Sequence, residues 1–117
     1  MASRQFSELT HPPREALTFT AVSAALSDPV RLAIVATLGA LPAGSELPCT
    51  TFALPVSKST QSAHFRALRE AGVIRQRDAG TRRLNSLRRE DLEARFPGLL
   101  DLAIAQGEAV SPAREPA

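Results

Sequence analysis

Aromatic residues, cysteine and histidine are scarce in this 117-residue sequence. It has five Phe but no Trp or Tyr, one Cys and two His. The lack of Trp and Tyr argues against an aromatic platform that stacks single-stranded nucleic acid. One cysteine cannot form a disulfide within the chain, so the fold does not need an oxidising compartment. We therefore expect one domain with a core of Leu, Ala, Val and Ile.

Long apolar runs are also missing. No segment approaches the roughly 20 apolar residues that a membrane-spanning helix needs. Residues 1–10 are polar overall and contain no apolar run of the signal-peptide type. We therefore expect a cytoplasmic protein that does not bind a membrane.

Metal ligands and catalytic groups are few. His11, His64 and Cys49 cannot form a regular nitrogen and sulfur zinc site within one subunit. A catalytic pair of Cys49 and His64 would lack a third, orienting residue and an oxyanion motif. We therefore expect no metal, no cofactor and no enzymatic activity.

The charged residues are unevenly distributed along the chain. The net charge is +2, but residues 57–95 contain ten basic and five acidic residues, a net charge of +5, which leaves −3 for the remainder. A basic half on a nearly neutral protein indicates a polyanionic partner that approaches from one side. The alternative is an arginine-rich face that is only solvated.

Capping residues and helical periodicity predict the first half of the fold. Apolar residues at helical spacing predict a helix over 14–26. Asp28 before Pro29 begins a second, largely apolar helix that reaches about Ala40. Two prolines leave room for only a short helix over 50–54, a suitable length for the first helix of a helix-turn-helix. Flexible tails are expected over 1–13 and 107–117, around a domain over 14–106.

The second half of the chain predicts a recognition helix and a wing. Ser57 is a good N-cap and Gly72 a good stop for a helix over 57–71. Strands over 73–77 and 82–87 flank a tight turn at 78–81. This order predicts a mainly α winged helix-turn-helix fold with a small β-hairpin wing. The helix can enter a DNA major groove, and the wing over 78–83 can reach the backbone or the minor groove.

The C-terminal region predicts a dimer. A helix begins near Leu87, and Pro97 breaks or kinks it. Its apolar stripe is broader than the domain core can bury and consists of Leu92, Phe96, Leu99, Leu100, Ala103 and Ile104. We expect a homodimer through the N- and C-terminal helices, with recognition helices about one DNA turn apart on an inverted repeat.

Two segments carry a resemblance to a known family. The sequences LSDPVRLAI over 26–34 and VSKSTQSAHFRALREAGVI over 56–74 resemble the opening signature and the recognition helix of the ArsR (arsenical-repressor) family of winged-helix regulators. The resemblance implies a homodimer that represses by binding an operator and is released by an inducing signal. Metal-sensing members carry a cysteine pair before the recognition helix, or Asp and His ligands in the last helix. This chain has only Cys49 at the first place and no His or Cys in the last helix.

The candidate DNA-binding residues lie on the recognition helix and the wing. They are Lys58, Ser59, Thr60, Gln61, Ser62, Arg66, Arg82 and Arg83. Small hydroxyls beside long cations suit close approach to bases and phosphates, although they could also be ordinary solvated residues. Gln61 either binds an adenine edge or replaces a core aliphatic residue. Arg82 and Arg83 point to opposite faces of a strand, so one can face DNA while the other pairs with an acid.

Three further residues have competing interpretations. Arg31 is expected in a structural network with Asp28, and His64 in packing or hydrogen bonding. Cys49 is either a small buried hydrophobic residue or a redox-sensing thiol. A small hydrophobic inducer would act at the interface between subunits. A winged helix that binds only proteins is the alternative to a DNA-binding repressor.

Overall fold

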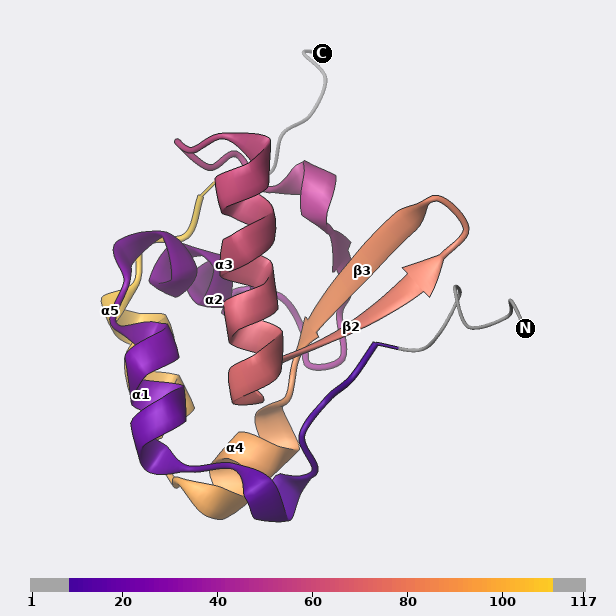
Figure 1. The fold of residues 1–117 in the computed structure, drawn as a ribbon. Helices are drawn as coiled ribbons and strands as arrows, with labels where there is room; N and C mark the ends of the chain where they lie inside the picture. Colours follow the sequence, from indigo (N-terminus) through magenta and orange to yellow (C-terminus); the bar gives the residue numbers. More distant parts are fainter. Residues whose placement is uncertain (1–8, 111–117) are drawn as a thin grey trace, which may run out of the picture.

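The computed structural model describes residues 9–110, which form a group of helices with a small sheet on one side (Figure 1). The helical elements are η2 (Arg14–Ala16), α1 (Phe19–Leu26), α2 (Pro29–Gly39), η3 (Cys49–Thr51), α3 (Lys58–Ala71), α4 (Arg89–Arg95) and α5 (Leu99–Gln106), of which η2 and η3 are single 3-10 turns. The strands are β1 (Leu47–Pro48), β2 (Ile74–Ala79) and β3 (Arg82–Leu87). This architecture confirms the predicted fold class, a mainly α winged helix-turn-helix with a β-hairpin.

The prediction of one continuous helix over 14–26 is wrong. The chain forms η2, becomes extended at Leu17 and Thr18, and only then begins α1. Leu17 is 2% exposed, so the extended backbone directs an apolar side chain into the core. Thr18 Oγ1 accepts a hydrogen bond from the backbone N–H of Ala21 at 3.2 Å and thereby caps α1. A buried leucine and a capping threonine together outweigh helical periodicity.

The second helix begins as predicted and ends one residue early, at Gly39. Asp28 Oδ1 accepts hydrogen bonds from the backbone N–H groups of Val30 and Arg31 at 2.8 and 3.1 Å. Burial acts to raise the pKa of Asp28, but these two donors outweigh it and hold the pKa below its ordinary value. Residues 34–38 of α2 are all buried, so α2 is the central helix of the domain.

The short helix predicted over 50–54 is absent from the described chain. Strand β1 lies just before this range, antiparallel to β3, with Leu47 opposite Asn85 and Pro48 opposite Leu84. The 3-10 turn η3 follows directly. Phe52 then enters the core, where its ring packs edge-on against Phe65 with centroids 5.2 Å apart. The element before the recognition helix is therefore one strand and one 3-10 turn, because the prolines prevent a longer helix.

The three strands form one antiparallel sheet in the order β1-β3-β2. The hairpin between β2 and β3 is tighter than predicted, since Ala79 pairs with Arg82 and only Gly80 and Thr81 form the loop. Gly80 has a φ of +66°, a conformation that favours glycine. β3 has the predicted bounds, whereas β2 begins one residue later and ends two residues later than predicted. The hairpin carries the wing away from the helices (Figure 1).

The C-terminal region forms two helices, α4 and α5, because the chain breaks around Pro97 as predicted. Gly98 takes a φ of +85° between them. The prediction that the apolar stripe of this region exceeds what the core can bury is wrong. Leu92, Leu100 and Ala103 belong to the core, and Phe96, Leu99 and Ile104 pack against it, because α5 lies against α2. Within residues 9–110 no single helix has the length and apolar composition to cross a membrane. Helices α1 and α2 have that length and composition only when taken together, and the pair is bent by 96°.

Parts of the predicted tails contact the folded domain. Arg88 Nη1 donates to the backbone oxygen of Pro12 at 2.7 Å, and the N–H of Gln76 donates to His11 Nε2 at 3.0 Å. The N–H of Val110 donates to Thr37 Oγ1 at 3.0 Å. Ordered contacts thus occur on both sides of the predicted domain over 14–106. Residues 1–8 and 111–117 of those tails lie outside the described residues.

Candidate nucleic-acid interface

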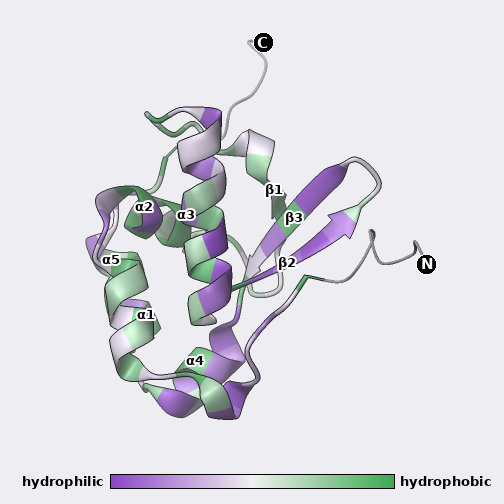
Figure 2. Cartoon of the chain, viewed as in Figure 1, coloured by the Kyte–Doolittle hydropathy of each residue, from purple (hydrophilic) through white to green (hydrophobic). Residues whose placement is uncertain are grey.

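Helix α3 has one buried face and one exposed polar face. Ser57 Oγ accepts a hydrogen bond from the N–H of Thr60 at 3.2 Å, and Gly72 ends the helix with a φ of +90°. Phe65 and Leu68 form the buried face. Figure 2 shows the hydrophilic residues along α3 and the hairpin. The exposed predicted residues of α3 are Lys58, Ser59, Thr60, Ser62 and Arg66.

Gln61 differs from its neighbours on α3 because its side chain is engaged within the protein. It is half-buried, and its Nε2 donates to the backbone oxygen of Cys49 at 2.9 Å. The bond ties the start of α3 to the turn η3. Gln61 therefore positions the helix, with its Nε2 engaged by a backbone carbonyl of the protein.

The two wing arginines have different partners. Arg83 Nε lies 2.8 Å from Asp78 Oδ1 across the hairpin, and this hydrogen bond holds the pKa of Asp78 below its ordinary value. Arg82 is exposed and forms no ion pair within residues 9–110. One arginine thus pairs with an acidic residue while the other stays without one, as the alternation of side chains along a strand predicts. The net positive charge of the wing comes from Arg82.

The other cations of the basic segment have ion-pair or hydrogen-bond partners within the protein. Arg77 forms a two-point ion pair with Glu46, at 2.8 and 2.9 Å. Arg69 donates to a glutamine, and Arg89 and Arg95 donate to backbone carbonyls. Of the ten basic side chains in segment 57–95, three have no ion pair or hydrogen bond to any group of the described chain: Lys58, Arg66 and Arg82. All three lie on α3 or at the wing, so the cations of this segment that have no internal partner gather there.

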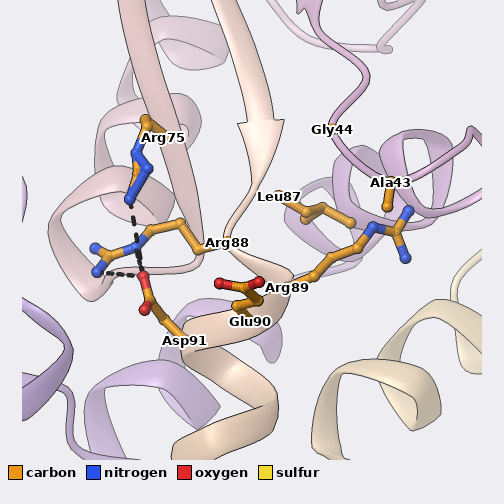
Figure 3. Close-up of a pocket in the computed structure, with 8 residues that line it drawn as sticks. All are labelled: Ala43, Gly44, Arg75, Leu87, Arg88, Arg89, Glu90 and Asp91. Carbon is orange, nitrogen blue, oxygen red and sulfur yellow. Dashed lines mark hydrogen bonds and ion pairs between the residues drawn. The ribbon is translucent and has the colours of Figure 1, made fainter.

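Asp91 is the shared ion-pair partner of three arginines at the base of the sheet. Its carboxylate lies 2.8 Å from Arg14 Nε, 2.8 Å from Arg88 Nη2 and 3.8 Å from Arg75 Nη2. Figure 3 shows Arg75 and Arg88 directed at Asp91 beside a pocket of about 460 Å³. The hydrogen bond from Arg14, followed by that from Arg88, holds the pKa of Asp91 below its ordinary value. The cluster contains three positive charges and one negative charge, so it keeps a net charge of +2 while Asp91 joins the three arginine side chains.

Arg31 and His64 have the internal roles that the sequence favours. Arg31 Nε donates to the backbone oxygen of Ala25 at 2.7 Å, at the C-terminal end of α1. Its Nη1 lies 3.1 Å from His64 Nδ1 on α3. Asp28 receives the backbone N–H of Arg31 and not its guanidinium. Arg31 therefore joins α1, α2 and α3, and His64 is one of its contacts.

Cys49 is a half-buried free thiol between α3 and the sheet. Its Sγ accepts a hydrogen bond from Asn85 Nδ2 at 3.2 Å. His64 contacts Arg31, so the geometry offers no Cys49–His64 pair. Within residues 9–110, no group of three His, Cys, Asp or Glu side chains is placed to hold a metal ion.

Sequence reasoning missed a buried polar chain that links α3 to the sheet. Gln76 and Asn85 are 3% and 0% exposed and lie opposite each other on β2 and β3. Gln76 Nε2 donates to Asn85 Oδ1 at 2.7 Å, and Arg69 Nη1 of α3 donates to Gln76 Oε1 at 2.8 Å. The available signal was the strand alternation, which turns residues 74, 76 and 84 inward together.

Comparison with known proteins identifies one relevant relative. Over 79 residues the chain is 39% identical to an uncharacterized HTH-type transcriptional regulator, YceK, of Bacillus subtilis (strain 168). The match covers 66% of this chain and 77% of the relative. No protein-family model matches the chain. With its helix α3, hairpin and this degree of identity over most of a regulator, the chain belongs to the HTH-type transcriptional regulators.

Proposed function

We propose that this regulator is a sequence-specific, ArsR-type repressor that acts in the cytoplasm on its own or a neighbouring operon. It binds an inverted-repeat operator as a homodimer, with α3 in the major groove and wing residues 78–83 on the backbone or in the minor groove. The observation that carries the proposal is the gathering of Lys58, Arg66 and Arg82, the cations without internal partners, on α3 and the wing.

The exposed side chains divide into two roles. Lys58, Arg66 and Arg82 neutralise phosphates, which supplies affinity for any sequence and positions the dimer. The short hydroxyl side chains of α3 approach base edges closely and select the operator. They are Ser59, Thr60 and Ser62. Gln61 and Arg83 contribute by position, since each is hydrogen-bonded within the protein.

The homodimer is supported by exposed apolar side chains on the first and last helices. Phe19 of α1 is 57% exposed and Leu102 of α5 is 58% exposed, and both helices pack against α2. Large apolar side chains on a regulator surface are buried economically by a two-fold partner. A small hydrophobic inducer would act at this interface by changing the spacing of the two recognition helices. Leu102→Asp is expected to yield monomers in sedimentation velocity, whereas the exposed Asp101→Asn leaves the dimer intact.

Fluorescence anisotropy with the protein's own upstream promoter tests the DNA-binding proposal. The promoter and a scrambled duplex are titrated over a salt series with the wild type and with Arg66→Ala. Arg95→Ala, on α4, is the matched control for loss of one positive charge. We expect promoter-selective binding whose log–log salt slope falls in magnitude by about 0.9 in Arg66→Ala and is unchanged in the control. Weak, salt-insensitive binding to both duplexes would overturn the proposal and favour a protein-interaction module.

A further inference from the structure

A cleft of about 210 Å³ lies between α3 and the hairpin. Ser62, Arg66 and Arg69 line it from α3, and Arg83 lines it from β3. The three α3 residues are spaced by four and three positions, so they share one face of the helix. The cleft is smaller than the roughly 300–1,000 Å³ of sites for drug-sized ligands. It has room for one small chemical group.

The lining of this cleft is strongly cationic. It contains three arginines and no carboxylate. Asp78 compensates Arg83 from outside the cleft, while neither Arg66 nor Arg69 forms an ion pair within residues 9–110. Two uncompensated guanidinium groups beside a hydroxyl attract an anion with several oxygen atoms.

Arg69 has a donor that the protein leaves without an acceptor. Its Nη1 donates to Gln76 Oε1, and the buried bond from Gln76 to Asn85 fixes that acceptor. Its Nε is buried and is hydrogen-bonded to no atom of the described chain. Buried donors are nearly always satisfied in folded proteins, and an unsatisfied charged donor is especially unfavourable. The guanidinium is thus held in a fixed orientation, and its buried Nε–H has no acceptor in the described chain.

We propose that this cleft binds a single phosphate group, and that the phosphate belongs to the backbone of bound DNA. Arg69 donates from Nε, Arg66 adds a second positive charge, and the Ser62 hydroxyl completes the site. The DNA source rests on the proposed function, while the chemistry of the site would equally accept inorganic phosphate. Arg69 becomes a DNA-contacting residue near the C-terminal end of α3, beyond the set predicted from sequence.

The Nε–H resonance of Arg69 in a 1H–15N spectrum provides a direct test. It is assigned by its loss in Arg69→Met and followed during titration with inorganic phosphate and, separately, with promoter duplex. We expect a saturable downfield shift with both. A shift with phosphate alone would overturn the DNA assignment, and no shift with either would overturn the site. Ser62→Asp, which places a carboxylate on the exposed rim, should abolish the shift by phosphate without disturbing the buried chain.

The salt dependence of DNA binding separates this proposal from the proposed function. Arg69→Met should lower the magnitude of the log–log salt slope by about 0.9 on promoter and scrambled DNA alike, whereas Arg95→Met should leave it unchanged. If Arg66→Met lowers the slope and Arg69→Met does not, the protein binds DNA but the cleft holds no phosphate. If the wild type binds no duplex, the proposed function fails, and the titration with inorganic phosphate alone then shows whether the cleft binds phosphate.

Discussion

Asp78 and Arg83 face each other across the hairpin as a registered cross-strand pair, with Oδ1 and Nε 2.8 Å apart. The carboxylate cancels the charge of one wing arginine, so the wing presents Arg82 as its net cation. We predict that Asp78→Asn strengthens DNA binding at low salt and raises the magnitude of the salt slope by up to about 0.9, because Arg83 becomes free to neutralise a phosphate. Anisotropy over a salt series measures this change, with the exposed Glu90→Gln of α4 as control. An unchanged slope with weaker binding would show that the pair acts by holding the hairpin in shape.

The ion pair between Asp91 and the buried Arg88 leads to a second prediction, which concerns the stability of the fold. The side chain of Arg88 is 3% exposed; its Nε donates to Asp91 Oδ2 at 2.9 Å, and its Nη2 lies 2.8 Å from the same oxygen. Asp91→Asn removes the negative charge and leaves a buried guanidinium without its ion-pair partner. We expect a loss of about 2 kcal/mol in the free energy of unfolding, measured by urea denaturation. Glu90→Gln, on the same helix turn but exposed, should change it by less than about 0.5 kcal/mol. Equal effects of the two substitutions would contradict a special role for Asp91.

The elements that the sequence predicts well are those with local signals at their ends. Ser57 and Gly72 bound the recognition helix, and Asp28 caps α2, so each boundary depends on a few neighbouring residues. Strand β1 has no such signal: two residues become a strand only because they pair with Leu84 and Asn85 of β3, which come 36 to 38 positions later in the chain. Its pairing is a tertiary contact that periodicity cannot reveal.

The candidate site follows the same division. The exposure of Lys58 and Arg66 follows from helix periodicity once the buried face is known. The partner of Gln61 is a backbone carbonyl 12 residues earlier, in a turn that the sequence did not predict. The hydrogen bond of Arg69 depends on Gln76 and Asn85, two inward-facing polar residues on different strands, so it could not be predicted from the sequence of α3. Which arginines are compensated is decided by such long-range contacts and not by composition.

The neutral ring of His11 gives stability a pH dependence. Its Nε2 accepts the N–H of Gln76, which requires an unprotonated nitrogen. Burial, followed by the charge of Arg75, lowers the pKa of His11 below 6.5. The unfolded chain therefore binds more protons than the folded one between the folded pKa and 6.5. The stability from this contact is complete above pH 6.5 and is lost as the pH falls through the folded pKa.

His11→Gln keeps a hydrogen-bond acceptor but cannot titrate, so it isolates the effect of His11. We predict that the free energy of unfolding of the wild type falls relative to this variant between pH 6.5 and pH 5, while the difference stays constant above pH 7. His64 is present in both proteins and cancels. Urea denaturation at several pH values measures the difference, and an NMR titration gives the pKa of His11 directly. A measured pKa at or above 6.5 would refute the prediction.

Gly72 joins the recognition helix to the wing, and its lack of a side chain has two separate causes. Its φ of +90° disfavours other residues, and a Cβ at this position would overlap Leu17 Cδ2 in the core. Gly44 has a similar φ of +87° but open space where a Cβ would lie.

We predict that Gly44→Ala lowers the free energy of unfolding by about 1 kcal/mol, from backbone strain alone. Gly72→Ala should cost at least about 2 kcal/mol more, because Leu17 is held against Gly72 in a close-packed interior. Thermal and urea denaturation of the two variants provide the comparison. Equal losses would mean that Leu17 moves aside without cost and that only the backbone conformation selects glycine at the end of the recognition helix.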